Sequence, residues 1–385
     1  MRHAESSRGS AGMNLTVVDF PAQIVLAPDD RVLVTRLDYL GDVILSLPLV
    51  DALHARWPQV EIDYLTRPPA SDLLDGDPRF SRVYSLARDA SVVESLRLMR
   101  ALRRRRYRAV VDLFGNPRSM WITRATGAPV RIGRTRGWRR RMYTHAPRCD
   151  AGVRAATRVH LTTAAALGVA GVEPNRPRLF VDPRRRDLGK KLLSGIRGSE
   201  PVVGLHPGGK WSVKRWPTSN FAELSRLVET QLGGHVVLFT GPGEERHTAA
   251  VLEANHARGG RASALGVRPI VEVAAIISQL EALVACDGGV MHTSVAVGTP
   301  TVGVFGSADP DIWFPYDAYG PYRAAFLPMP CRPCHRHVCP LGTTACLATL
   351  DAKSVLEVLR DVLAGDDAGR QRHGDEGHSA GDCNG

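Results

Sequence analysis

The sequence predicts an α/β protein of two domains, each built on a mostly parallel sheet covered by helices on both faces. Three observations lead to this prediction. The chain has 385 residues, which is more than one hydrophobic core typically organises and is enough for two domains. Short apolar runs alternate with helical patterns along both halves of the chain. A charged segment without a strand pattern, residues 183–200, separates the two halves.

The first half contains four short apolar runs that predict strands, at residues 31–35, 60–65, 82–86 and 109–113. Helical patterns alternate with them, near residues 46–56, 92–104, 117–126 and 153–168. Pro48 disfavours a continuous first helix, so we expect a short turn that restarts near Ser46. Because helices follow the strands, the strands should run parallel. We predict one domain over residues 29–182, preceded by a flexible extension, residues 1–28.

The second half repeats the alternation from Val202 onward. Its predicted strands lie at residues 202–205, 235–240, 262–265, 282–285 and 301–305. Its predicted helices lie at residues 218–232, 244–256, 270–280, 289–297 and 351–364. We predict an exposed connecting helix in the linker 183–200, a second domain over residues 201–350 and a final helix over 351–365. Residues 366–385 are rich in Gly, Asp, Arg and His and lack apolar periodicity, which predicts a disordered tail.

Composition and charge limit the classes of protein. No apolar run reaches the ~18 residues needed to span a bilayer. The polar first residues lack a signal-peptide core, so we expect a cytoplasmic protein. The 50 basic and 39 acidic residues give a formal charge of +11. This charge suits an acidic partner, such as a phosphorylated lipid, the inner face of the cytoplasmic membrane or nucleic acid. It equally suits a solvated, arginine-rich surface.

Two arginine clusters stand out, Arg103–Arg106 and Arg131–Arg141. Neither falls in a recognisable nucleic-acid-binding module, so we expect no nucleic acid partner.

Two glycine-bearing loops predict a phosphate-binding site. Asp287–His292 follows the apolar run Leu283–Ala285 and opens a helical pattern. Glycines let backbone N–H groups approach an anion, and the start of a helix adds partial positive charge. The second loop, His206–Lys210, follows another predicted strand and leads to the cationic segment Lys214–Pro217. Because ligands bind beyond the carboxyl ends of parallel strands, we expect both loops to line one diphosphate pocket.

The loop after the first strand carries Arg36, Asp38 and Asp42. It lacks the G-x-G-x-x-G pattern of dinucleotide-binding proteins, so an oxidoreductase is disfavoured. Asp42 follows a glycine and opens an apolar helical run. Two interpretations stand at this point: Asp42 is an ordinary acid in a first helical turn, or it is a general base that takes a proton from a hydroxyl group.

Four motifs occur along the chain in a specific order. They are Arg-Val-Leu-Val-x-Arg-x-x-x-x-Gly-Asp-Val, the glycine loop with Lys-Arg-Trp-Pro, Asp-x-Gly-x-x-His and Val-Phe-Gly-x-x-Asp-Pro. Together they resemble the glycosyltransferase family nine heptosyltransferases, which build the inner core of lipopolysaccharide. The resemblance covers about residues 30–365. It implies the GT-B fold, in which two Rossmann-like domains face a central cleft, the first binding the acceptor and the second the nucleotide sugar.

The resemblance also implies an inverting transfer from ADP-heptose. Asp42 would take the proton from the acceptor hydroxyl, and Lys214, helped by Arg215, would neutralise the leaving diphosphate. No cofactor would then be required for catalysis, because fixed cations and backbone dipoles supply the stabilisation. The other donor-binding residues implied are Gly208, Gly209, Glu244, Asp287, Gly288, Gly289 and His292. The family often has Thr or Ser where this chain has Gly288, which removes one hydroxyl group from the donor site.

On the acceptor side the resemblance implies Arg36, Asp38 and Tyr39, with a glycolipid of the lipopolysaccharide core type as acceptor. Alternatives are a nucleotide-sugar transferase that acts on a small natural product or a protein and, in a different class, a metal-stapled nucleic-acid-binding protein. The second of these leaves both anion loops unexplained. It would show salt-dependent retention of nucleic acid without binding of nucleotide sugars.

Four cysteines lie within sixteen residues, in the loop 331–346: Cys331, Cys334, Cys339 and Cys346. Thiolates at this spacing can hold zinc or iron in a structural site. The alternatives are a metal-free thiol cluster or a disulfide formed on oxidation. We expect a structural role in every case.

Overall fold

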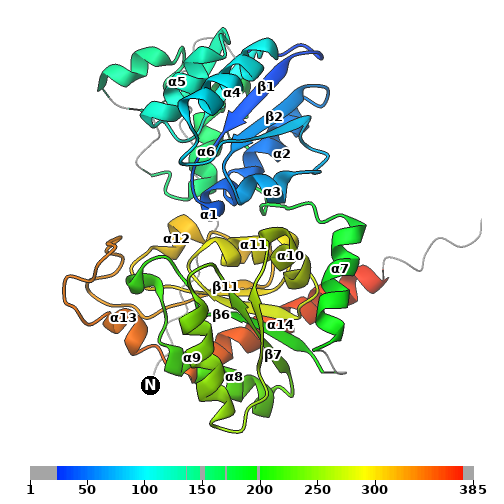
Figure 1. Cartoon of the computed structure of the whole chain (residues 1–385), viewed down its shortest axis with the longest axis vertical. Helices are drawn as coiled ribbons and strands as arrows, with labels where there is room; N and C mark the ends of the chain where they lie inside the picture. Colours follow the sequence, from blue (N-terminus) through cyan, green and yellow to red (C-terminus); the bar gives the residue numbers. More distant parts are fainter. Residues whose placement is uncertain (1–23, 136, 148–151, 170, 197–199, 376–385) are drawn as a thin grey trace, which may run out of the picture.

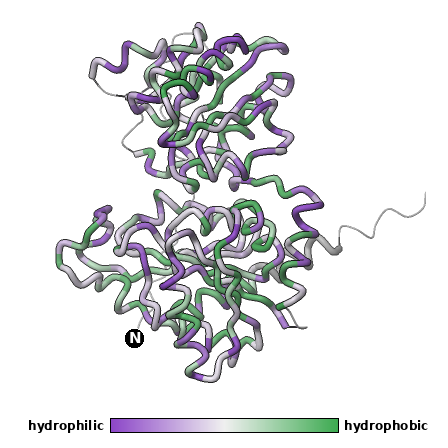
Figure 2. The backbone as a smooth tube through the Cα atoms, in the orientation of Figure 1, coloured by the Kyte–Doolittle hydropathy of each residue, from purple (hydrophilic) through white to green (hydrophobic). Residues whose placement is uncertain are grey.

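Two parallel sheets organise the chain into an upper and a lower domain (Figure 1). The computed structural model describes residues 24–375, except for 136, 148–151, 170 and 197–199. The predicted α/β class and the two-domain organisation are both confirmed. In each domain the apolar residues gather along the strands and the inner faces of the helices (Figure 2). In the described part of the chain, no helix is both long and apolar enough to cross a membrane.

The first domain has a five-stranded sheet in the order β3-β2-β1-β4-β5, with every pair parallel. Its strands are β1 (Arg31–Thr35), β2 (Glu61–Thr66), β3 (Arg82–Ser85), β4 (Ala109–Asp112) and β5 (Val130–Gly133). Its helices are α1 (Leu40–Ile44), α2 (Leu47–Arg56), α3 (Ala70–Leu74), α4 (Val92–Arg104), α5 (Pro117–Ala125) and α6 (Ala156–Thr163). The expected interruption near Pro48 is present, since α1 ends at Ile44 and α2 begins after Ser46.

The second domain has a six-stranded parallel sheet in the order β11-β10-β9-β6-β7-β8. Its strands are β6 (Val202–His206), β7 (His235–Thr240), β8 (Ser263–Val267), β9 (Ala282–Cys286), β10 (Thr301–Val304) and β11 (Tyr322–Ala325). Its helices are α7 (Pro183–Ser194), α8 (Thr218–Gln231), α9 (Glu245–His256), α10 (Ile270–Ile277), α11 (Gly289–Val297), α12 (Pro310–Trp313), α13 (Ala345–Ala348) and α14 (Ala352–Asp375). This strand order is that of a Rossmann-type sheet.

Some elements differ from the sequence prediction. β5 and β11 were not predicted, because a run of only four residues gives a weak periodic signal. The helix expected over 153–168 ends at Thr163. There the hydroxyl groups of Thr162 and Thr163 donate to carbonyls one turn back, an arrangement that weakens and bends helices.

Both predicted ends of the chain need correction within the described residues. Residues 24–28 were expected to belong to a flexible extension, yet Leu26 is buried in the core of the first domain and Ile24 N–H donates to the carbonyl of Ala166 at 3.0 Å. This apolar stretch is too short to give a periodic signal. Helix α14 continues to Asp375, into the segment 366–385 that we expected to be disordered, because extending a formed helix is easy even for a polar sequence.

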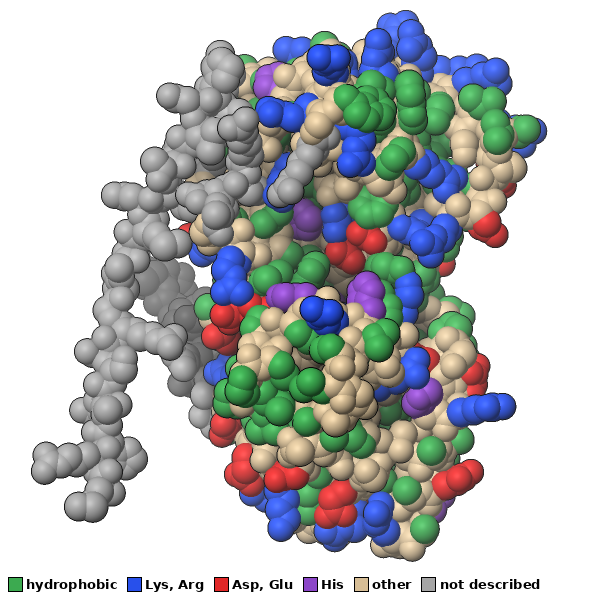
Figure 3. All heavy atoms as spheres, turned by 90° about the vertical axis from the view of Figure 1, so that its left-hand side faces the viewer, with side chains coloured by type: hydrophobic (Ala, Val, Ile, Leu, Met, Phe, Trp, Pro, Cys, Tyr) green, Lys and Arg blue, Asp and Glu red, His purple; other side chains and the backbone are tan. Residues whose placement is uncertain are grey.

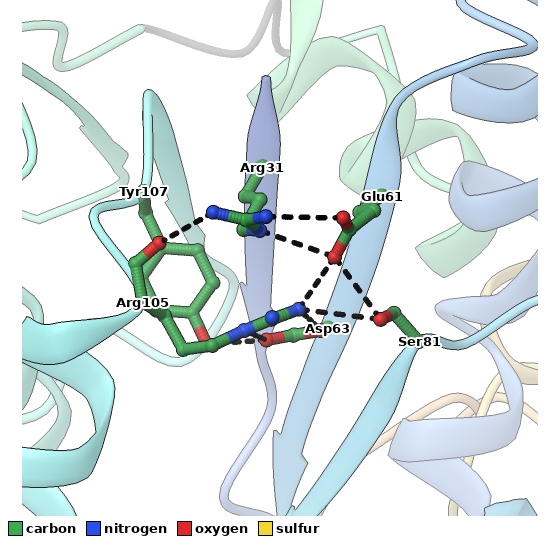
Figure 4. A network of polar contacts seen from close by, with 6 residues as sticks. All are labelled: Arg31, Glu61, Asp63, Ser81, Arg105 and Tyr107. Carbon is green, nitrogen blue, oxygen red and sulfur yellow. Dashed lines mark hydrogen bonds and ion pairs between the residues drawn. The ribbon is translucent and has the colours of Figure 1, made fainter. Parts of the chain in front are cut away.

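An ionic network fixes the end of α4 to the sheet (Figure 4). Arg105 lies 2.9 Å from Asp63 and 2.7 Å from Glu61, and Tyr107 donates to Asp63 at 2.6 Å. Glu61 also pairs with Arg31 at 3.1 Å, and this contact is the main reason why the pKa of Glu61 falls to about 2. Because Asp63 is buried, a compensating cation is required, and Arg105 supplies it.

Candidate active site

The domains meet where α1 and α11 face each other, each at a glycine. A Cβ atom added to Gly41 would lie 2.6 Å from the ring of His292, and one added to Gly289 would lie 2.9 Å from Leu40. These distances are too short for real Cβ atoms, so this contact requires both glycines. Figure 3 shows the molecule hollowed between the domains, where acidic, basic and histidine side chains gather. The cleft therefore lies at the carboxyl ends of strands in both sheets.

The first domain places a partly buried charged cluster in the cleft. Arg36 Nη2 lies 2.7 Å from Asp42 Oδ1 and 3.2 Å from Asp38 Oδ2. The guanidinium group also lies over the ring of Phe114, 5.6 Å from its centroid. Although Asp42 is in the first turn of α1, its carboxylate accepts its hydrogen bond from a side chain and not from the helix backbone. Its position in the first turn is that of an ordinary helical acid, and its hydrogen bond also joins it to the Arg36 cluster.

The pKa of Asp42 is raised above its ordinary value. Burial is the main cause, and the neighbouring carboxylate of Asp38 adds to it. Arg36 and Lys214 act in the opposite direction and lower this pKa. Lys214 belongs to the second domain, so charges from the two domains influence each other across the cleft. A raised pKa makes a carboxylate a better proton acceptor, which is the property that a general base needs.

The glycine loop of the second domain encloses a carboxylate. A Cβ atom added to Gly208 would lie 1.8 Å from Glu244 Oε2. That oxygen lies 3.1 Å from His206 Nε2 and accepts a hydrogen bond of 3.0 Å from the N–H of Gly241. Burial works to raise the pKa of Glu244, but His206 and the N–H groups of Gly241 and Gly209 lower it below its usual value. The loop that was expected to bind a diphosphate thus surrounds an anion of the protein itself.

Partly buried Lys214 and buried Asp287 form an ion pair at the start of α11. Lys214 Nζ lies 2.5 Å from Asp287 Oδ2, and no hydrogen bond to this oxygen is found among the described residues. Asp287 is only 5% exposed. A buried carboxylate oxygen with spare acceptor capacity is suited to a ligand hydroxyl group. The ion pair meanwhile holds the ammonium group of Lys214 in the cleft.

Gly288 and His292 differ in what surrounds them. Gly288 is extended, with φ 178° and ψ −175°, and a Cβ atom added there would meet only the carbonyl of Cys286, at 3.7 Å. His292 is buried, and its Nδ1 lies 3.0 Å from the hydroxyl of Tyr316. Burial lowers the pKa of His292 to about 4, so its imidazole is neutral. The histidine therefore packs against the other domain through Gly41 and contributes no charge.

Arg215 is tied to the glycine loop. Its Nε donates to the carbonyl of Gly209 at 2.5 Å, and its Nη1 lies 3.1 Å from His247 Nε2. A side chain held in this way supports the shape of the loop and keeps a positive charge beside it.

Tyr39 lies at the centre of an aromatic and cationic group that sequence analysis did not single out. Its hydroxyl contacts the Nζ of Lys210, which also lies 4.0 Å from the ring centroid. Lys210 lowers the pKa of Tyr39, and Arg88 adds to this effect. Trp211 meets the Tyr39 ring edge-on at 6.1 Å and stacks on His337 at 4.2 Å. Lys210 and Trp211 directly follow the glycine loop, and this position was the available signal.

Further arginines of the first domain surround this group. Arg67 lies 4.0 Å from Asp38 and 5.9 Å from the Tyr39 ring centroid. Arg118 on α5 donates to the carbonyls of Ala87 and Arg88 in the loop after β3. The first-domain side of the cleft therefore carries more positive charge than Arg36 alone, the one cation predicted there.

The sequence model of glycosyltransferase family 9 (heptosyltransferase) matches residues 95–345. The chain belongs to this family. It is 28% identical to lipopolysaccharide heptosyltransferase 1 of Pseudomonas aeruginosa over 330 residues, covering 82% of this chain and 88% of the relative. Its structure is similar to that of ADP-heptose lps heptosyltransferase II of E. coli, with a TM-score of 0.72, 21% identity and coverage of 88% and 99% of the two chains. The protein is thus a glycosyltransferase with the GT-B fold, as predicted.

The cysteine loop packs against the turn that follows β10. Arg332 donates to the carbonyls of Gly306 and Ala308 at 2.6 and 3.1 Å, and the N–H of Cys334 donates to Ser307 at 3.1 Å. Another structure with this fold is the iron-containing glycosyltransferase TibC of E. coli, with a TM-score of 0.53, 15% identity and coverage of 87% and 76%. In the described residues of this chain, no three His, Cys, Asp or Glu side chains are arranged to hold a metal ion.

Proposed function

We propose that this glycosyltransferase moves heptose from ADP-heptose to a sugar hydroxyl group of a glycolipid of the lipopolysaccharide core type, with inversion at the anomeric carbon. One observation carries the proposal. Gly41, next to the partly buried Asp42, packs against His292 of α11, and Lys214 lies 2.5 Å from Asp287 just before the same helix, so Asp42 and Lys214 border one cleft. A base for the acceptor and a cation for the leaving group thus face the same space. The relatives named for lipopolysaccharide heptosyl transfer support the choice of sugar and acceptor.

The proposed reaction is a single displacement. Asp42 takes the proton from the acceptor hydroxyl while the oxygen of that hydroxyl forms a bond to the anomeric carbon. The bond between that carbon and the diphosphate oxygen breaks on the opposite face, and ADP leaves. Arg36 holds the carboxylate of Asp42 in position at 2.7 Å. Asp38 helps to keep the pKa of Asp42 raised.

The second domain would hold ADP and stabilise its departure. The ammonium group of Lys214 and the N–H groups at the start of α11 provide positive charge where the diphosphate becomes more negative. Arg215 supports the glycine loop from behind. Glu244 would accept the ribose hydroxyls, and the unsatisfied oxygen of Asp287 would accept a hydroxyl of the donor sugar or the acceptor. His292 would line the donor site as a neutral group.

The acceptor would enter on the side of Tyr39. The cations there, Arg67, Arg88, Arg118 and Lys210, suit an acceptor that carries negative charge near the reacting hydroxyl. Such an acceptor belongs to a glycolipid that is assembled on the cytoplasmic side of a membrane. The cysteine loop has no step in this chemistry, and a zinc or iron ion in it stays a prediction that elemental analysis of the purified protein would test.

Calorimetric titration of the purified protein with ADP-heptose, ADP, GDP and UDP tests the donor. We expect the adenine nucleotides to bind selectively. Incubation with ADP-heptose and a heptose-free core glycolipid should then add the mass of one heptose to the acceptor. Selective binding of another nucleotide would move the function to a different sugar. Binding of no nucleotide at all would contradict the enzyme proposal.

A further inference from the structure

The positive charge of this chain is concentrated in one segment. Residues 90–149 contain sixteen arginines, no lysine and only two acids, Glu94 and Asp112, so the segment has a net charge of +14. The rest of the chain has 34 basic and 37 acidic residues and a net charge of −3. The overall charge of +11 is therefore a property of part of the first domain and not of the whole surface.

Helix α4 in this segment exposes apolar side chains together with arginines. Only its inner side is packed, through Leu102. Val92 is 75% exposed, and Leu96 and Arg100 follow on the same side of the helix at intervals of four residues. Arg103 extends the row by one more turn. Exposed apolar residues are normal when scattered, but a row of them that continues into arginines is the pattern of a membrane-surface helix.

Neighbouring elements continue this surface. Helix α5 packs against α4 and against the turn Gly137–Met142, and these two elements expose Trp121 and Trp138 at 56% and 66%. Three arginines, Arg139, Arg140 and Arg141, directly follow Trp138 in this turn. We name α4, α5 and the turn Gly137–Met142 the arginine face. In Figure 3 basic and apolar side chains are interspersed over the upper domain, whereas acidic side chains appear among the basic ones over the lower domain.

The fold does not account for the outer arginines. Arg105 neutralises Asp63 and Glu61 within the domain. By contrast, within the described residues no ion pair is found for Arg100 or Arg104. Arg105 and Arg108 have acidic neighbours, but outer arginines such as Arg100 and Arg104 repel one another, and an external anion would relieve this repulsion.

The arginine face borders the acceptor side of the cleft. Arg118 on α5 lies 3.3 Å from the hydroxyl of Ser95 on α4, and it donates to the carbonyl of Arg88 at 2.8 Å. Arg88 in turn adds to the effect of Lys210 in lowering the pKa of Tyr39 in the cleft. If a lipid surface contacted the first turns of α4, its head groups would therefore lie next to the proposed entry site of the acceptor.

We propose that the arginine face docks on a bilayer that contains anionic phospholipids, with Val92, Val93, Leu96, Trp121 and Trp138 entering the interface and the arginines pairing with phosphate groups. This proposal rests on the proposed function, because it brings a lipid-linked acceptor to the cleft. The alternative occupant is nucleic acid, which the charge would also suit. The aliphatic side chains at the start of α4 favour lipid, because Val and Leu neither stack on bases nor pair with phosphates.

Co-flotation of the full chain with vesicles tests the docking without donor or acceptor, so its result is independent of catalysis. We expect binding to vesicles of phosphatidylcholine mixed with phosphatidylglycerol and little binding to phosphatidylcholine alone. Each arginine near an anionic surface contributes roughly fivefold, so the double variant R100E/R104E, which removes two positive charges and adds two negative ones, should bind at least roughly 25-fold more weakly. The double variant R258E/K353E changes two exposed charges of the second domain by the same amount and should bind as the unchanged protein does.

The apolar part of the surface has its own variant. V92S/L96S keeps every charge, and it should reduce vesicle binding and the quenching of tryptophan fluorescence by brominated lipids. ADP binding by calorimetry should stay unchanged in all these variants, which shows that they fold. Equal binding of R100E/R104E and R258E/K353E to anionic vesicles would overturn the proposal. Retention of RNA with the same loss in R100E/R104E, but no flotation with vesicles, would assign the arginine face to nucleic acid instead.

Discussion

The two sides of the cleft are built from different kinds of chemical group. The first domain contributes side chains, and the buried carboxylates of Asp38 and Asp42 share one arginine there. The second domain contributes mainly backbone, through glycine loops and the start of α11, with Lys214 as its fixed cation. Backbone N–H groups suit a diphosphate, whose oxygens are all alike, whereas a proton must be taken by one carboxylate in one place. On the proposed function, the difference corresponds to proton transfer in the first domain and donor binding in the second.

Among the variants considered, Asp42→Asn should have the largest effect on turnover. The amide keeps the size of the side chain and cannot accept the proton, so turnover should fall by roughly 10³-fold while ADP binding stays the same. Release of ADP in a coupled assay and calorimetry measure the two quantities. Asp38→Asn is the matched control, because it removes a carboxylate from the same Arg36. It should change turnover much less, and normal turnover in Asp42→Asn would remove this residue from catalysis.

Lys214→Ala should affect both sides of the comparison. The cation contacts the donor before and during the reaction, so we expect weaker ADP binding and turnover lowered by roughly 10²-fold. The partner, Asp287, would also become a buried carboxylate without an ion pair. The double variant with Asp287→Asn separates these causes. If it restored full turnover, the loss would come from the stranded carboxylate and not from the leaving group.

Most of the fold could be predicted from the sequence because parallel strands are buried on both faces and give plain apolar runs. β1, β7 and α11 were predicted with the bounds that the structure gives. β5 and β11 were missed although β3, another edge strand of four residues with an arginine, was predicted, so strands this short give an uneven signal and gain their structure from pairing with a neighbour.

The site residues also divide into those that the sequence could predict and those that it could not. Asp42, Lys214 and Gly289 lie in motifs whose local pattern carries meaning. The contact between Lys210 and Tyr39 joins residues 171 positions apart, and the stack of Trp211 on His337 joins two loops of the second domain. The sequence marks Lys210 and Trp211 only by their position at the glycine loop, and it does not show which residues they contact, because that depends on how the fold places separate elements. The role of Glu244 under Gly208 was missed for the same reason.

His292 provides a test in stability instead of rate. In the unfolded chain this histidine binds a proton below its ordinary pKa of 6.5, but in the folded protein only below about 4. The unfolded state therefore binds more protons between these values, and stability should fall by about 3 kcal/mol as the pH drops through this window. Denaturant unfolding at pH 7 and near pH 4.5 measures the loss. His292→Gln keeps a polar contact to Tyr316 and should show a smaller loss, and an equal loss would assign the acid sensitivity to other groups.

The neighbouring glycines of α11 give the smallest and most local test. Gly288 is an extended N-cap with open space at its Cβ position, whereas a Cβ atom on Gly289 would lie 2.9 Å from Leu40 of the first domain. Gly288→Ser should stabilise the protein by about 0.5 kcal/mol, because serine caps a helix better and restricts the unfolded chain. Gly289→Ser should instead cost roughly 1–3 kcal/mol and weaken the contact between the domains. Thermal melting of both variants measures the difference. Equal effects would mean that α1 and α11 do not touch in solution, and the division of labour would then rest on a cleft that closes only around its ligands.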